Sequence, residues 1–221
     1  VAIMDRNHIE VMVDISPLIG DDLTAMLEAV GRFPGRFYCF TGVDFAGIGT
    51  AKWLQRELDQ LARAKEMGVV GVKFAKSFGL TIRDESDRVM AVDDMRLAPL
   101  LDRAGELGLL VAFHTADPKA FFQPLDERNE RWQELKHNPE WWFGDRRRYP
   151  YGWWSLIRQL EKVVARHPHT LFMGAHFGCA AEEVEYVAEV MRDYSNYLVD
   201  IAARIGEIGR HDPGLVHELF T

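Results

Sequence analysis

Six short apolar segments alternate along the chain with longer segments in which apolar residues recur every three or four positions. The short segments are almost continuously apolar, which is typical of strands in a parallel sheet covered on both faces. The longer segments have the period of an amphipathic helix. Strand–helix alternation of this regularity predicts consecutive βαβ units and therefore a parallel sheet. The predicted strands are 10–16, 36–45, 68–76, 109–115, 170–176 and 196–203, and the predicted helices are 21–33, 51–68, 93–108, 154–168 and 181–194.

An open doubly wound sheet and a (β/α)8 barrel both fit this alternation, and the strand ends distinguish them. A dinucleotide-binding doubly wound fold needs a Gly-x-Gly-x-x-Gly turn after its first strand, and none follows Ser16. Every predicted strand instead has a charged or imidazole side chain at or near its C-terminal end, where a barrel builds its active site. We therefore predict that residues 1–221 form a single domain, an incomplete TIM-like (β/α)8 barrel with about six strands. The strand-end residues are Asp14, Asp44, Lys73, His114, His176 and Asp200.

Composition narrows the function classes. The chain has 26 basic and 34 acidic residues, a net charge of −8, which disfavours a general nucleic-acid binder because phosphate contacts need clustered cations. No apolar segment approaches the ~20 residues that span a membrane. The two cysteines, Cys39 and Cys179, provide neither a disulfide framework nor a closely spaced metal pair. We expect a cytoplasmic protein that acts on a small molecule, with no nucleic-acid or membrane partner.

Two histidines stand at the ends of predicted strands. His114 ends the segment LLVAFH, and His176 ends the segment TLFMGAH. A neutral imidazole is the commonest protein ligand of zinc, and an imidazole with a suitable pKa is also a general base. The alternative is that each ring caps its strand by a hydrogen bond to a neighbouring loop. Two such rings on one barrel favour a functional site, whereas we expect the other six histidines to lie mostly at the surface.

Lys73 interrupts the apolar segment GVVGVKF, and burying its charge is costly without a partner or a purpose. It could form a Schiff base, bind a substrate carboxylate, or become a carbamate that bridges metal ions. The alternative is an ion pair with Asp44 or Asp200. For Lys76, beyond the same strand, a functional and a structural role are about equally supported.

Several longer segments resemble a known family, from about Ile9 to Arg210. They are GVKFAKSFGL, VDDMRLAPLLDRAGELG, HTADPKAFFQPLDERNERWQEL, ARHPHTLFMGAHFG and VDIAARIGEIGR, of which HTADP and NERW are the most specific. These segments resemble the amidohydrolase-related metal-dependent hydrolases, a branch that includes enzymes similar to aminocarboxymuconate-semialdehyde decarboxylase. The resemblance implies a distorted TIM barrel that holds one divalent metal ion, usually Zn²⁺, at its C-terminal face.

The resemblance also implies roles for individual residues. His114 matches a metal ligand of the family, and His176 matches a histidine near the metal that activates bound water. Lys73 matches a lysine expected to bind a substrate anion together with Arg204. Asp200 and Arg204 match the DIAAR segment, which is expected to orient the end of its strand. Asp44 is added to the residues expected to contact substrate from its strand-end position rather than from the resemblance, and it could equally be a metal ligand, a base or a partner of Lys73.

The sequence also departs from the family. A His-x-His pair that binds metal on the family's first strand has no counterpart before the segment MDRNHIEVMVDIS. The spacing recurs at His167 and His169, but they precede a predicted strand and so belong to the wrong end of the barrel. The metal-binding aspartate of the family's last strand has no counterpart either. We therefore expect a six-stranded part of an eight-stranded enzyme, lacking three of the usual metal ligands.

A long loop at about 118–155 carries five of the six tryptophans. Connections between strands and helices usually have ~2–6 residues, so this loop is an insertion. It could be a lid that excludes water from the site, an aromatic interface of a homodimer, or a loop packed on its own small core. The segment 125–135 within it is predicted to be a short helix.

These observations favour a metal-dependent hydrolase in which metal-activated water attacks a small carboxylated or cyclic substrate. A decarboxylase-like lyase of the same family is the nearest alternative. A catalytically silent barrel fragment that serves as a scaffold or binds a partner is another, and a metal-free lyase that uses Lys73 as a Schiff base is a third.

Overall fold

The computed structural model describes residues 1–220, which build a single six-stranded parallel sheet. The strands are hydrogen-bonded in sequence order, and each lies within one of the predicted segments. Because all six are parallel, their C-terminal ends lie at one edge of the sheet, as the barrel prediction requires. The strands are β1 (Met12–Asp14), β2 (Phe37–Thr41), β3 (Gly71–Phe74), β4 (Leu110–Phe113), β5 (Phe172–Gly174) and β6 (Tyr197–Val199).

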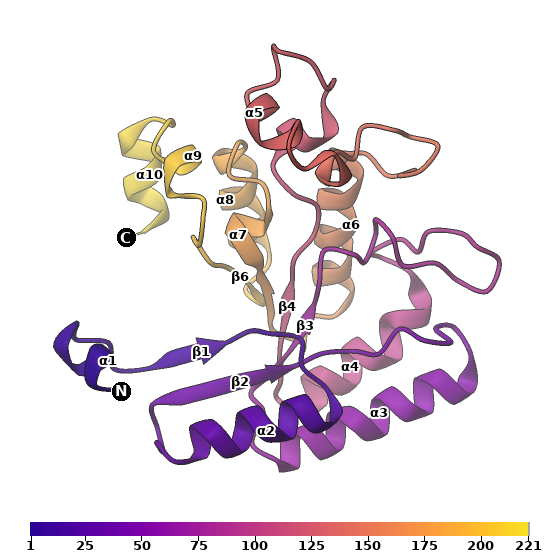
Figure 1. The fold of residues 1–221 in the computed structure, drawn as a ribbon, viewed down its shortest axis with the longest axis vertical. Coiled ribbons are helices and arrows are strands. Elements are labelled where there is room, and N and C mark those ends of the chain that lie inside the picture. Colours follow the sequence, from indigo (N-terminus) through magenta and orange to yellow (C-terminus); the bar gives the residue numbers. More distant parts are fainter. Residues whose placement is uncertain (221) are drawn as a thin grey trace.

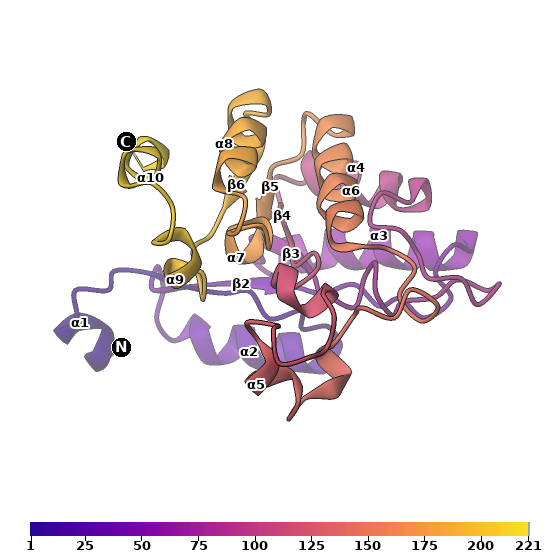
Figure 2. The same ribbon diagram turned by 90° about the horizontal axis from the view of Figure 1, so that it is seen from above.

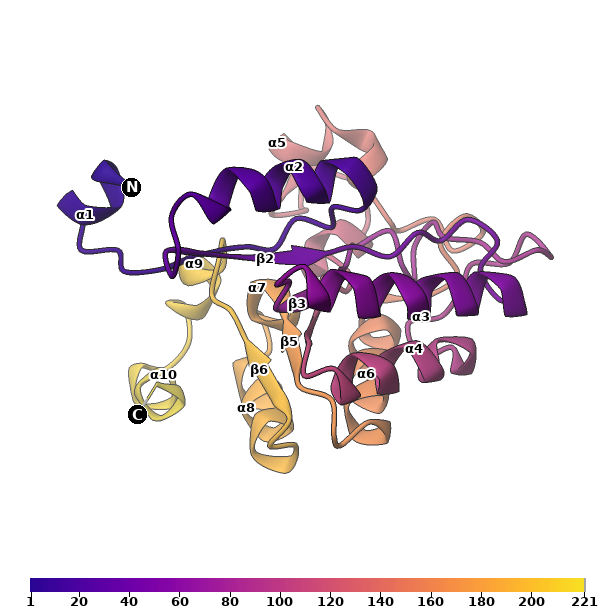
Figure 3. The same ribbon diagram turned by 90° about the horizontal axis from the view of Figure 1, so that it is seen from below.

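The sheet is strongly twisted, so that β1 and β2 run across the view of Figure 1 while β4 and β6 run steeply. One long helix follows each of the first five strands, and these helices flank the sheet in chain order (Figures 1 and 3). They are α2 (Gly20–Gly31), α3 (Ala51–Glu66), α4 (Ala98–Glu106), α6 (Trp153–Arg166) and α8 (Val184–Asp193). Shorter helices are α1 (Ala2–Arg6), α5 (Trp132–Leu135), α7 (Ala175–Gly178), α9 (Ile205–Ile208), α10 (Pro213–Leu219), η1 (Met95–Leu97), η2 (Lys119–Phe122) and η3 (Pro139–Trp141).

The helix ends follow from local chemistry. Thr50 caps the start of α3 by accepting a hydrogen bond from the backbone N–H of Trp53 at 3.0 Å. Helices α3 and α4 end just before Gly68 and Gly108, whose φ values of +96° and +62° suit glycine at a helix C-terminus. Both endings agree with the sequence prediction.

The main core lies between the sheet and its helices. Phe74 of β3 stacks on Phe113 of β4 with ring centroids 4.5 Å apart, and both rings are almost completely buried. Helix α6 adds a buried stripe that includes Leu156, Leu160 and Val164, at the spacing of one helix face.

The opposite, concave face of the sheet is open in the described residues. Val13, Tyr38 and Leu198 are 52%, 42% and 44% exposed, although they lie in strands. A hollow of about 610 Å³ lies against this face and is lined by Val13, Tyr38, Phe40, Leu110 and Met173 among others. Strands β1 and β6 form the two edges of the sheet, so residues 1–220 make a half-barrel rather than a closed one.

The aromatic loop, here residues 118–152, lies beyond the C-terminal end of β4, at the top of Figure 1 and in front of the sheet in Figure 2. The predicted loop was three residues too long, because Trp153, Trp154 and Ser155 already belong to α6. The predicted helix at 125–135 is also shorter than expected and covers only Trp132–Leu135. Phe143 packs on Phe122 and Tyr149 with ring centroids 5.4 and 5.0 Å apart, and all three residues belong to the main hydrophobic core.

Among residues 1–220, no helix is both long and apolar enough to cross a membrane.

Candidate active site

The two strand-end histidines lie side by side. His114 directly follows β4, and His176 lies two residues beyond the end of β5. Their ring centroids are 4.7 Å apart, with the rings nearly perpendicular at 74°. The sequence-based expectation that these rings share one site is therefore met in space.

His176 is carried by a left-handed turn, α7. His176, Phe177 and Cys179 have φ values of 57°, 60° and 54°, and Gly178 between them has 64°. Each non-glycine residue in this region costs about 1–2 kcal/mol. Within the described residues, five of the seven non-glycine residues with positive φ lie in the loops after β4, β5 and β6. Such concentration of backbone strain is characteristic of functional sites.

The segment after β6 holds this turn in place. The backbone N–H of His176 donates to Asp200 Oδ1 at 2.9 Å, and that of Phe177 donates to the Asp200 carbonyl at 2.6 Å. Asp200 Oδ1 also accepts from the N–H of Ala202 at 2.9 Å. These contacts give Asp200 a structural task at the site, namely fixing the backbone that carries His176.

The same segment fixes the tautomer of His176. Its Nδ1 lies 2.8 Å from the carbonyl oxygen of Ala202. A carbonyl oxygen can only accept, so Nδ1 carries the proton of the neutral ring and Nε2 keeps a lone pair. Nε2 has no partner among the described residues, and it is the atom at which this ring can take up a proton.

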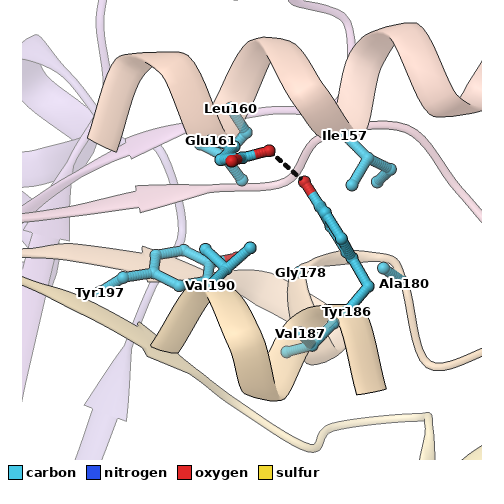
Figure 4. Close-up of a pocket in the computed structure, with 9 residues that line it drawn as sticks. All are labelled: Ile157, Leu160, Glu161, Gly178, Ala180, Tyr186, Val187, Val190 and Tyr197. Carbon is cyan, nitrogen blue, oxygen red and sulfur yellow. Dashed lines mark hydrogen bonds between the residues drawn. The ribbon is translucent and has the colours of Figure 1, made fainter. Parts of the chain in front are cut away.

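Tyr197 of β6 supports the turn from below. A methyl group on Gly178 would lie only 2.5 Å from Tyr197 Oη, so the ring and the turn are in close contact. Figure 4 shows Tyr197 and Gly178 beside a small cavity that also reaches Tyr186 and Glu161, which are hydrogen-bonded at 2.6 Å. The cavity is about 10 Å³, room for at most one water, so it is a packing feature rather than a substrate site.

His114 is backed by two residues that the sequence did not assign to the site. Asp117 Oδ1 lies 3.4 Å from His114 Nε2, and Asp117 Oδ2 accepts a hydrogen bond from Lys76 Nζ at 2.9 Å. Burial lowers the pKa of the His114 imidazole, and the neighbouring Asp117 partly opposes this shift. Because the net shift is downward from 6.5, the neutral ring predominates at pH 7. The sequence signal was the aspartate three residues after the histidine in HTADP.

Lys73 is a buried amine without a partner. It is 7% exposed and makes no hydrogen bond or ion pair with any described residue. Burial lowers the pKa of its ammonium group, and the nearby charge of Asp200 acts in the opposite direction. The expected close pairing with Asp44 or Asp200 is not present, since neither carboxylate lies within ion-pair distance.

Arg204 has one buried nitrogen free. The residue is 7% exposed, and its Nε has no hydrogen-bond partner. A terminal nitrogen lies 3.9 Å from the carboxylate of Glu207, which is also buried and accepts a hydrogen bond from Arg131 of the aromatic loop. The NERW segment, which contains Arg131, thus ties the aromatic loop to the region that carries Arg204.

Three other polar residues lie apart from the site. Asp44 pairs with Arg56 at 3.1 Å and accepts from the N–H of Ala46, so its carboxylate serves the loop after β2. Asp14 accepts from the N–H of Ser16 at the end of β1. His167 was expected at the surface, which is wrong: it is 6% exposed and its Nδ1 lies 2.6 Å from Asp102.

Cys179, next to His176, is not a nucleophile. Complete burial raises the pKa of its thiol to about 12, so the reactive thiolate is absent near neutral pH.

The described residues do not complete a metal site by themselves. A catalytic zinc ion typically has three protein ligands and an open position. His114 and His176 supply two adjacent imidazoles, but residues 1–220 contain no group of three or more His, Cys, Asp or Glu side chains placed to hold one ion.

Comparison with known proteins decides the family. A family model described as Amidohydrolase matches residues 6–217, nearly the whole chain. The chain belongs to this amidohydrolase family. No match was found among curated proteins.

Solved structures agree with this amidohydrolase assignment at the level of the fold. A TIM-barrel protein from Bordetella bronchiseptica is 15% identical, with a TM-score of 0.54 over 90% of this chain and 56% of its own. An amidohydrolase from Burkholderia multivorans is 12% identical, with a TM-score of 0.52 over 99% of this chain and 64% of its own. A weaker similarity, with a TM-score of 0.48 and 12% identity, links 99% of the chain to 83% of 2,6-dihydroxybenzoate decarboxylase from Rhizobium. The chain thus spans less than two thirds of the Bordetella and Burkholderia barrels, and the TIM-barrel prediction is confirmed in its incomplete form.

Proposed function

We propose that the chain carries the histidine-bearing part of a hydrolase site that acts on a small carboxylated or cyclic substrate. The observation that supports this most is the contact between His114 and His176 at the C-terminal edge of a parallel sheet, beside a buried and unpaired Lys73. Pockets with a few convergent polar groups at strand ends are where such folds carry out chemistry.

The roles follow from the free atoms. His176 is the general base, because Nε2 has a lone pair while Nδ1 is held by Ala202. Lys73 and Arg204 bind a substrate anion, since both are buried cations with unused donors. His114 is a ligand of a divalent ion, Zn²⁺ being the first candidate, although the remaining ligands are not among the described residues.

Two related activities compete with hydrolysis. Decarboxylation would use the same anion site and proton transfer at His176, with loss of CO₂ from the bound carboxylate. Schiff-base chemistry is favoured by one observation, the burial of Lys73, which lowers the pKa of its ammonium group and so increases the share of neutral amine.

Calorimetric titration with Zn²⁺ tests the metal assignment. We expect one ion per chain, with affinity reduced at least about tenfold by His114→Ala, which removes an imidazole ligand, and much less by His176→Ala, which removes the proposed base but no ligand. His137→Ala is the control, because His137 is exposed in the aromatic loop. Equal zinc affinity in all variants would refute the metal assignment and favour the scaffold alternative.

Product analysis separates the activities. A panel of cyclic amides, lactones and aromatic acids is incubated with the zinc-loaded chain while acid release and CO₂ release are both recorded. Acid release without CO₂ supports the hydrolase, whereas CO₂ release supports the lyase. If borohydride traps a carbonyl substrate covalently on Lys73, both of these activities are refuted and Schiff-base chemistry is supported.

A further inference from the structure

Behind His114 lies an ion pair between the buried carboxylate of Asp117 and the partly exposed amine of Lys76. Asp117 is 6% exposed, and its two oxygens have different partners. Oδ1 lies 3.4 Å from His114 Nε2, while Oδ2 accepts a hydrogen bond from Lys76 Nζ at 2.9 Å. A turn at Ala116, which has a φ of 65°, brings Asp117 back against the histidine three residues before it.

The aromatic loop and the start of α6 enclose this pair. Lys76 Nζ lies 5.6 Å from the centre of the Trp141 ring and 6.0 Å from that of Phe143, within the range of a cation–π interaction. Trp153 donates its indole N–H to the backbone carbonyl of Asp117 at 3.0 Å. The loop thus contacts the lysine that binds the carboxylate, and Trp153 holds the backbone of Asp117.

The carboxylate determines which nitrogen of His114 carries the proton. Nε2 is buried and makes no hydrogen bond with any described residue, and the carboxylate oxygen Asp117 Oδ1 lies 3.4 Å from it. An ionised carboxylate accepts and does not donate, so proton placement on Nε2 is favoured and the lone pair is left on Nδ1. His176 has the opposite arrangement, with the proton on Nδ1 and the lone pair on Nε2.

We propose that Asp117 and Lys76 are positioning residues that hold His114 in the Nε2–H tautomer, and that the aromatic loop serves to hold this pair. The tautomer of the His114 ring can be tested by itself, whereas its use in catalysis rests on the proposed function of His114. A carboxylate behind a histidine commonly fixes the ring and its tautomer in this way. The geometry thus assigns the loop a task at the site without requiring it to open or close.

Side-chain ¹⁵N NMR of the metal-free chain tests this directly. The two ring nitrogens of a neutral histidine resonate at well-separated shifts according to which one is protonated, and His114→Gln identifies the signals of His114. In Asp117→Ala the ratio of the Nε2–H to the Nδ1–H tautomer should fall roughly tenfold to a hundredfold, the range for a hydrogen bond to a charged group. In Lys76→Met it should fall by a smaller factor, because the carboxylate remains but loses its anchor.

Lys119→Met is the matched control. Lys119 also pairs with a carboxylate, that of Glu183 at 2.6 Å, and also lies over a tryptophan of this region, 5.2 Å from the Trp153 ring centre. Its side chain is 35% exposed against 38% for Lys76, but it does not touch His114. The tautomer ratio should be unchanged in this variant.

Two outcomes overturn the proposal. One is an unchanged tautomer ratio in folded Asp117→Ala, and the other is an equal change in Lys76→Met and Lys119→Met. If Asp117→Ala does not fold, Asp117→Asn replaces it, with an expected fall of roughly fivefold since a neutral acceptor is weaker than a charged one. The measurement uses neither zinc nor substrate, so it is independent of whether the proposed function holds.

Discussion

Burying the charged side chain of Lys73 lowers the free energy of unfolding of the chain. The residue is 7% exposed, and its ammonium group makes no hydrogen bond or ion pair with any described residue. Folding therefore removes most of the side chain from water without giving its charge a partner. Sites commonly retain such groups for binding or catalysis at the expense of stability.

Replacing Lys73 should stabilise the chain in a pH-dependent way. Burial lowers the pKa of Lys73 in the folded state from its usual 10.5, so between the two values the unfolded chain binds more protons and wild-type stability rises with pH. Below that window the wild type bears the full cost of the buried charge, and above pH 10.5 the cost is gone. Lys73→Met should therefore have a higher free energy of unfolding at pH 7, and this advantage should disappear as the pH rises to 10.5.

Urea unfolding at several pH values measures this difference. Lys136→Met, at an exposed lysine, is the control and should show no such trend. A Lys73→Met variant that is less stable than the wild type at pH 7 would show that the ammonium group has a stabilising partner and would contradict the description of Lys73.

At the residue scale, the sequence indicated the candidate site residues better than the residues that hold them in place. His114, His176 and Lys73 were identifiable because a polar residue that ends or interrupts an apolar strand is unusual. Asp117 escaped because its approach to His114 depends on the left-handed turn at Ala116, and an alanine gives no hint of positive φ. The sequence did not predict the ion pair of Asp44 with Arg56, because Arg56 belongs to the following helix.

At the scale of elements, the aromatic loop is fastened to the segment after β6 by its NERW motif. Arg131 binds the buried carboxylate of Glu207, and Glu130 pairs with Arg210 at 3.0 Å. Both partners of the loop lie in or next to α9, which directly follows Arg204. The motif therefore links the loop over β4 to the region that carries a proposed substrate-binding residue.

The two ion pairs of this motif should differ in strength. Arg131→Ala leaves Glu207 buried with only a long contact to Arg204, so we expect the free energy of unfolding to fall by about 2–3 kcal/mol. Arg210→Ala removes a pair whose side chains are 60% and 44% exposed, and the expected loss is below about 1 kcal/mol. Chemical denaturation of the two variants measures both values, and equal losses would mean that the Glu207 contact is not a buried clamp.

Element boundaries were predicted less well than element types. Strand β2 ends at Thr41, although the apolar segment continues to Phe45, because Val43 and Phe45 pack in or against the core without strand pairing. The sequence left three interpretations of the aromatic loop, of which a loop packed on its own core was as well supported as the lid and the homodimer interface together. In the structure Phe122, Phe143 and Tyr149 of the loop belong to the main hydrophobic core, through ring contacts that the local sequence pattern does not encode.

At the scale of the molecule, the chain is a half-barrel with its chemistry at one end and an apolar concave face. The six-stranded parallel order follows from the alternation of strands and helices, and the sequence predicted it. Both termini lie on the same side of the molecule, toward the edges formed by β1 and β6 (Figures 1 and 3). The arrangement places His114 and His176 just beyond the ends of two neighbouring inner strands, so their relative position is set by the pairing of β4 with β5.

The most direct test of the account is anomalous diffraction at the zinc absorption edge from crystals of the chain soaked in Zn²⁺. We predict one zinc peak at the C-terminal edge of the sheet, about 2.0–2.1 Å from His114 Nδ1, with His176 Nε2 facing the ion but not bonded to it. A peak that does not contact His114, or zinc bound solely at other histidines, would contradict the claim that the two imidazoles form one site with His114 as its metal ligand.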